Sequence, residues 1–141
     1  MIMQNRSRVL AAAAACLVIA ATALAQHASL KPDATVKEVM QALTIPLSDI
    51  IFASSSEPPT TAAQWASLRR DALALAEAGR LLTVAPRARD EGEWMAKAQA
   101  HIDAAAAVAK AAGRKNAEEL SSAGDALYET CPACHARYMT R

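Results

Sequence analysis

Residues 116–138 read NAEELSSAGDALYETCPACHARY, and this stretch has the pattern of one amphipathic helix. Asn116 offers a side-chain oxygen to cap the first turn, and Glu119 completes a capping-box pattern three residues later. Apolar or small residues then recur every three or four positions, at Leu120, Gly124, Leu127, Cys131, Cys134 and Tyr138. This spacing puts them on one helix face. Pro132 lies inside the segment and is expected to kink the helix or to interrupt one hydrogen bond.

Three segments upstream repeat this pattern. Each opens with an acceptor three residues before an acid or amide, in the pairs Thr35 with Glu38, Thr61 with Gln64, and Asp90 with Glu93. The apolar positions are Val36, Met40, Leu43, Leu47 and Ile50; then Trp65, Leu68, Ala72, Leu75, Gly79 and Leu82; then Trp94, Ala98, Ile102, Ala105 and Ala109. Pro46 is expected to kink the first of these helices or to interrupt one of its hydrogen bonds. Because loop-like residues at 54–59, 86–91 and 113–115 separate the segments and no strand pattern appears, the sequence predicts an all-α fold. Its architecture is an antiparallel up-down-up-down four-helix bundle.

The composition indicates one helical domain with a thin core. The chain has 141 residues, of which 53% are hydrophobic and only 4% aromatic. Alanine favours helix but fills little space, so a large flat apolar cofactor would suit such a core. The net charge of +1 gives no reason to expect nucleic acid or a charged membrane surface as a partner.

Residues 1–25 have the features of a secretory signal peptide. Arg6 and Arg8 make a basic start, residues 9–23 are almost all apolar, and Ala23-Leu24-Ala25 fits a signal-peptidase site. We therefore expect a mature chain of residues 26–141, forming one domain in the periplasm, with no membrane span. Two alternatives stay open: an uncleaved anchor, and lipidation at Cys16.

Cys131, Cys134 and His135 form C-x-x-C-H, the attachment motif for c-type haem. Cysteines three apart on a helix share a face, where both reach one porphyrin edge, and the next residue can offer a neutral imidazole nitrogen to the iron. The sequence predicts one covalent haem c, held by Cys131 and Cys134, with His135 as an axial iron ligand.

Three other interpretations of the motif compete with haem. A zinc site wants four ligands, and residues 26–141 contain only these two cysteines. A thioredoxin-like dithiol wants a preceding strand in an α/β pattern. A structural disulfide would close so short a loop that it would stabilise little.

The last helix resembles that of a known family. Tyr128, Cys131, Cys134, His135 and Tyr138 near the end of a secreted Ala-rich chain are similar to the class II c-type cytochromes, the cytochrome c′ family. The resemblance covers about residues 33–141. A basic residue often follows the last aromatic in this family, whereas this chain has Met139 there and Arg137 two places earlier.

The resemblance implies two classes of iron site, one open on the distal side and one closed by a methionine of the first helix. Met40 occupies about the position of that methionine and is expected to be the second iron ligand, as in the low-spin, Met-ligated branch. Packing alone is the plainer role for a methionine on an apolar face. His101 and Met95, on helix flanks, and His27, near the new amino terminus, are weaker candidates, and Met139 is too close to His135 in sequence.

The expected function is that of a periplasmic electron carrier, not an enzyme, which exchanges electrons with redox partner proteins. Lys37 is expected to contact a haem propionate, since similar proteins often have an arginine in the place of Val36. The first alternative is a five-coordinate cytochrome c′-like protein that binds nitric oxide or carbon monoxide. A haem-free structural bundle is a further alternative.

A homodimer is also expected. Ile45 and Phe52 lie seven residues apart and are predicted to point away from the seam of the first helix. Proteins of similar architecture often pair through their first two helices, and a two-fold dimer needs one self-complementary patch.

Overall fold

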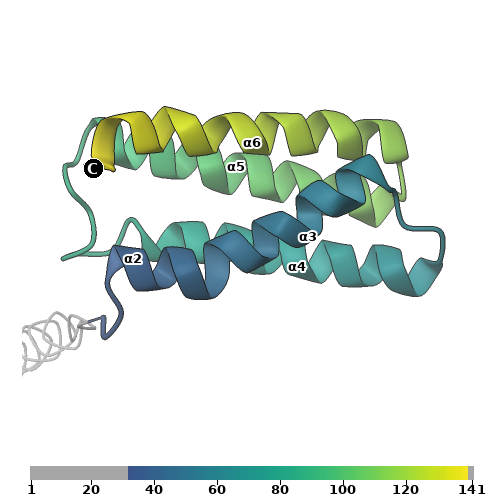
Figure 1. Cartoon of the computed structure of the whole chain (residues 1–141), viewed down its shortest axis with the longest axis horizontal. Coiled ribbons are helices and arrows are strands. Elements are labelled where there is room, and N and C mark those ends of the chain that lie inside the picture. Colours follow the sequence, from purple (N-terminus) through teal and green to yellow (C-terminus); the bar gives the residue numbers. More distant parts are fainter. Residues whose placement is uncertain (1–31, 140–141) are drawn as a thin grey trace, which may run out of the picture. The chain divides into compact units, whose positions relative to one another are not determined.

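The computed structural model describes residues 32–139. Its helical segments are α2 (Val36–Val39), η1 (Met40–Thr44), α3 (Ile45–Ser56), α4 (Ala62–Leu81), α5 (Glu93–Arg114) and α6 (Ala117–Tyr138). The segments α2, η1 and α3 follow one another without a break and are called the first helix below. The described part therefore consists of four helices and no strand, as predicted (Figure 1). Residues 1–25, the predicted signal peptide, lie outside it.

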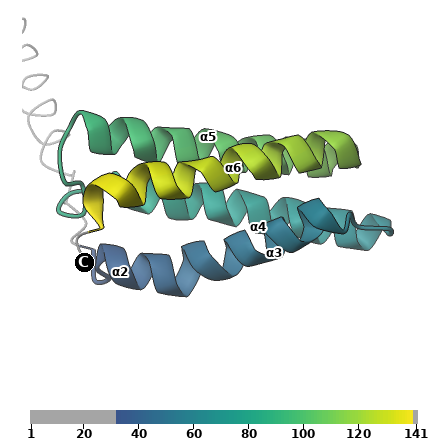
Figure 2. The same ribbon diagram turned by 45° about the horizontal axis from the view of Figure 1, so that its top comes forward.

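The four helices pack as a ring of antiparallel neighbours. Contacts join α3 to α4, α4 to α5 and α5 to α6, and α3 also meets α6, which closes the ring. In Figures 1 and 2 the first helix runs beside α4 and α6 runs beside α5. This is the up-down-up-down order that short loops favour. Within residues 32–139 no helix is long and apolar enough to cross a lipid bilayer.

Three of the four predicted caps are present. The side chains of Thr35, Thr61 and Asn116 accept hydrogen bonds from the backbone of Glu38, Gln64 and Glu119, respectively. The fourth prediction is wrong in detail, because Gly92 is the N-cap of α5. Asp90 Oδ1 instead accepts from the backbone N–H of Gly92 at 2.9 Å and of Trp94 at 3.0 Å. Asp90 thus still satisfies donors at the start of the helix, from two positions before the N-cap.

The predicted apolar seams of α4 and α5 are buried in full, and that of α6 is buried up to Leu127. The seam of the first helix was predicted in the wrong register. Leu43 is 39% exposed and Ile50 45% exposed, whereas the buried residues of this helix are Val39, Thr44, Ser48 and Ile51.

A π turn explains the shifted register. The backbone N–H of Ile45 donates to Met40 O, five residues back instead of four. Pro46 has no N–H, and in an α-helix its ring would meet the carbonyl of Ala42. The wider turn accommodates the ring and leaves one surplus residue, which rotates the segment before it relative to α3. The regular hydrogen-bond pattern is therefore interrupted at Pro46, which was one of the two expected outcomes, and the interruption takes the form of a π turn.

Candidate functional site

A pocket of about 240 Å³ lies between the first helix, α5 and α6, and its walls are mainly apolar. Four of the five predicted site residues line it, namely Met40 from η1 and Cys131, Cys134 and His135 from α6. The fifth, Lys37, is an exposed residue of α2 and is not among the lining residues. The pocket thus brings together residues that are about 90 positions apart in the sequence.

The motif residues face the pocket because they lie three and four positions apart on α6. Pro132 sits between the cysteines without ending the helix. Both thiols are half-buried and not joined to each other. Burial raises the pKa of the Cys131 thiol and of the Cys134 thiol, so both keep their protons at neutral pH. The Cys131 Sγ lies 3.9 Å from Leu127 O, to which it can donate.

Met40 stands where the first helix changes from α to π. Its side chain is half-buried against a cluster that contains Val39, Leu82 and Trp94. The π turn determines which way this part of the helix faces, and Met40 lines the same pocket as His135. Met95 is half-buried and packs against that cluster too, but it is not a lining residue of the pocket.

His101 is buried in the pocket wall, at 7% exposed, and not on a helix flank as the sequence predicted. Its Nδ1 lies 3.1 Å from Thr130 Oγ1, and the Thr130 hydroxyl donates its only hydrogen to Leu127 O at 2.6 Å. The shared hydrogen bond therefore requires His101 Nδ1–H as the donor, which leaves Nε2 with a free lone pair. Burial lowers the pKa of His101 and favours this neutral ring.

Three buried side-chain atoms of the described residues have no hydrogen-bond partner: His101 Nε2, Thr44 Oγ1 and Ser48 Oγ. All three residues line the pocket. Buried polar atoms are almost always paired, so these three atoms are positions at which a bound group or ordered water would find a hydrogen-bond partner. This cluster was not predicted from the sequence, although His101 follows Trp94 by seven residues, a spacing that puts both on one side of α5.

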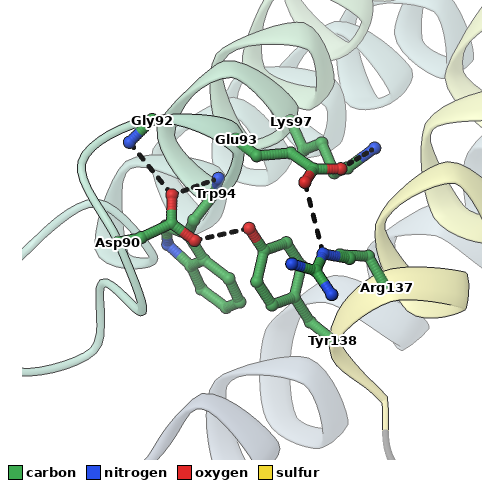
Figure 3. A network of polar contacts seen from close by, with 7 residues as sticks. All are labelled: Asp90, Gly92, Glu93, Trp94, Lys97, Arg137 and Tyr138. Atoms are coloured by element: carbon green, nitrogen blue, oxygen red, sulfur yellow. Dashed lines mark hydrogen bonds and ion pairs between the residues drawn. The ribbon is translucent and has the colours of Figure 1, made fainter.

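The last turn of α6 is fixed by an aromatic and polar contact with α5 and the loop before it (Figure 3). The ring of Tyr138 meets the ring of Trp94 edge-on, with centroids 5.0 Å apart. Its hydroxyl donates to Asp90 Oδ2 at 2.5 Å, which raises the pKa of Tyr138 to about 12. Trp94 Nε1 in turn donates to Leu82 O at 2.8 Å. These contacts hold the turn that carries His135.

Two cations lie near the pocket. Glu93 pairs with Lys97 at 3.3 Å and with Arg137 at 3.3 Å, and so joins α5 to α6 (Figure 3). Lys97 lines the pocket, whereas Lys37, the predicted propionate contact, does not. The sequence analysis missed Lys97, because only the packing of α5 against α6 shows that it lies near Cys134.

No protein family, curated protein or solved structure matches this chain. The site must therefore be judged on its own chemistry. Two thiols, an imidazole and a thioether around an apolar pocket fit a covalently attached haem. Between residues 32 and 139 no group of three or more His, Cys, Asp or Glu side chains could hold a metal ion, which a zinc site requires.

Proposed function

We propose that this protein is a monohaem c-type cytochrome of the cytochrome c′ type and acts as an electron carrier in the periplasm. The observation that carries the proposal is that one apolar pocket is lined by Cys131, Cys134, His135 and Met40. The predicted signal peptide supports it too, because residues 1–25 would take the chain out of the cytoplasm.

Each of the four side chains has a role in this proposal. The bound haem would supply one-electron exchange between ferric and ferrous iron. Cys131 and Cys134 would hold the haem through two covalent bonds, and His135 would offer a neutral nitrogen to the iron. The soft sulfur of Met40 would favour ferrous iron and so raise the reduction potential.

The pocket walls suit electron transfer. The pocket, of about 240 Å³, is smaller than the roughly 300–1,000 Å³ of ordinary ligand sites, so it would enclose a porphyrin only in part. The part left uncovered would be available for electron exchange with a partner protein. Trp94 and Phe52 are among the apolar residues that line the pocket. Lys97 is a better placed cation for a propionate than Lys37.

Covalent attachment is tested by extracting the denatured protein with acid acetone. Wild-type protein should keep its haem stain, and Cys131→Ala/Cys134→Ala should lose it. Pro132→Ala is the matched control, because it changes the same helix turn and leaves all three motif residues in place. A wild type that loses its colour on extraction contradicts the proposal.

The role of Met40 is tested by the visible spectrum of the ferric protein. We expect a low-spin spectrum with the far-red band of thioether coordination, which Met40→Leu should abolish. Met95→Leu should leave the band unchanged, because Met95 is half-buried but does not line the pocket. A high-spin wild type would instead assign the protein to the alternative class, which binds nitric oxide or carbon monoxide.

A further inference from the structure

The proposed function gives His101 no role, yet its side chain is the most constrained polar group of the pocket. The ring is 7% exposed, and Nε2 has no hydrogen-bond partner. A buried acceptor left unpaired costs stability, and replacing it with an apolar group would remove that cost. The cost is offset only if Nε2 has a partner in the working protein.

The other ring nitrogen shows which kind of partner Nε2 suits. His101 Nδ1–H donates to Thr130 Oγ1, whose own hydrogen is committed to Leu127 O. One nitrogen donating to a fixed oxygen while the other presents a lone pair is the arrangement found around metal-ligating histidines. It fixes both the tautomer and the ring orientation. Thr130 is directly before Cys131 in the sequence, so the same turn of α6 carries the haem attachment and the orienting hydroxyl.

The backbone of α4 holds the ring from the other side. A Cβ atom built on Gly79 would lie 3.1 Å from Cδ2 of His101 and 2.8 Å from Cγ1 of Ile102. Gly79 therefore makes the space in which the imidazole packs. With Thr130 on one side and Gly79 on the other, the ring is held in place without any ligand.

We propose that His101 can replace Met40 as an iron ligand in this pocket and binds the iron through Nε2 when the Met40 thioether leaves. The inference rests on the proposed function, because it needs a haem attached through Cys131 and Cys134. In the exchange one iron–sulfur bond breaks and one iron–nitrogen bond forms. No electron or proton is transferred, because Nε2 already has a free lone pair. The imidazole is the harder donor, so the exchange is favoured in the ferric state.

The position of His101 in the pocket wall changes the expected effect of removing the Met40 side chain. If Met40 were the only protein ligand besides His135, its removal would leave a high-spin iron. Because His101 lines the same pocket, Met40→Ala should instead stay low-spin, with a spectrum typical of two nitrogen ligands and without the far-red thioether band. The double variant Met40→Ala/His101→Leu should be high-spin. Met40→Ala/Met95→Leu is the matched control and should stay low-spin.

Carbon monoxide binding to the reduced protein gives a second measurement. Since carbon monoxide binds only the open fraction of the iron, its apparent affinity for Met40→Ala should be at least about tenfold weaker than for Met40→Ala/His101→Leu. Met40→Ala/Thr130→Val should fall between the two, because it leaves the imidazole in place and removes only its orienting hydroxyl. This variant keeps the test decisive if His101→Leu fails to fold.

The outcomes separate the two proposals. A wild type without covalent haem overturns the proposed function. A wild type with the thioether band, together with a Met40→Ala protein that is high-spin and binds carbon monoxide as tightly as the double variant, overturns the role of His101 alone.

Discussion

Tyr138 and Asp90 lie 48 positions apart and share one short hydrogen bond. The bond needs a protonated Tyr138 hydroxyl as donor and an ionised Asp90 carboxylate as acceptor. The Tyr138 hydroxyl and the backbone N–H of Trp94 hold the pKa of Asp90 below its usual range, and Asp90 raises the pKa of Tyr138 to about 12. Folding thus favours the ionised carboxyl and the protonated phenol. The hydrogen-bonded pair therefore stabilises the fold only at pH values between the titration of the Asp90 carboxyl and that of the Tyr138 hydroxyl.

Tyr138→Phe should therefore lower the urea midpoint by an amount that depends on pH. The wild-type advantage from Asp90 is present above its unfolded pKa of about 3.9 and is lost as the pH falls through its lower folded pKa. The advantage from Tyr138 is present below pH 10 and is lost as the pH rises from 10 to about 12. Unfolding curves across this range check it. Tyr128→Phe, at a residue that is 58% exposed, is the control, and an equally large effect there would contradict the prediction.

Two glycines of this bundle should respond to alanine in opposite directions. Gly79→Ala places a methyl group 2.8 Å from Ile102 Cγ1 and should destabilise the protein by about 1–3 kcal/mol. Gly113→Ala meets only the flexible Arg69 side chain at 3.4 Å and should stabilise it by up to about 1 kcal/mol, because alanine is the better helix former. Urea denaturation measures both. Equal effects would show that the approach of α5 to α4 at Gly79 is looser than described.

At the scale of the element, the first helix shows how one proline sets the face of a whole segment. The π turn over Met40–Thr44 rotates everything before it relative to α3. As a result Val39 and Thr44 are buried, Leu43 is exposed, and Met40 lines the pocket. A regular α-helix through the same residues would turn these side chains by about one position, which is about 100°.

Pro46→Ala should separate stability from iron ligation. Alanine restores the backbone N–H that proline lacks. Inside a regular α-helix it is more favourable than proline by up to about 3 kcal/mol. The stability of the protein should therefore stay the same or rise. The rotation that follows should turn Met40 from the pocket and weaken the far-red thioether band. Pro58→Ala, in the exposed loop after α3, is the control. A Pro46→Ala protein with an unchanged band would show that the π turn has another cause.

At the scale of the whole molecule, the bundle has a core with few large side chains. Its fully buried large residues are Ile51, Leu75, Leu120, Leu127 and Val108, and alanines fill much of the remainder. Trp65 is the one aromatic residue in this core, whereas the other four gather in two pairs, Phe52 with Tyr128 and Trp94 with Tyr138. A cofactor in the pocket would therefore complete the core as well as the site.

The expected dimer patch also changes once the helices are packed. Ile45 is 52% exposed, but Phe52 is half-buried, with its ring 5.8 Å from that of Tyr128, and both residues line the pocket. The expectation that both point away from the seam is wrong, because the π turn shifts the register. The homodimer stays a prediction, and of the two residues only Ile45 remains a suitable test position.

Ile45→Glu should dissociate the predicted homodimer, because a charge in a self-complementary contact is placed opposite its own copy. Sedimentation at micromolar concentration measures it. Val84→Glu is the control, since Val84, in the loop after α4, is 40% exposed and outside the first two helices. A wild type that sediments as a monomer contradicts the prediction, and a dimer that both substitutions dissociate shows that the effect of Ile45→Glu is not specific to the predicted patch.

Local spacing along the chain was enough to predict the four helices, three of their caps and the C-x-x-C-H motif. These features are local. A cap is made by residues three apart, and the apolar spacing of α4, α5 and α6 needs no knowledge of their neighbours. The motif is equally local, because Cys131, Cys134 and His135 lie within five consecutive residues.

Only the tertiary structure decided the register of the first helix, the burial of His101 and the closeness of Lys97 to the pocket. Each depends on which faces of different helices meet. The π turn distributes the surplus residue so that Ile51 and Val39 can both be buried. His101 is oriented by a hydroxyl 29 positions away and by the missing side chain of Gly79. These arrangements are selected by the free energy of packing between helices. That packing cannot be predicted from the spacing of residues along one helix.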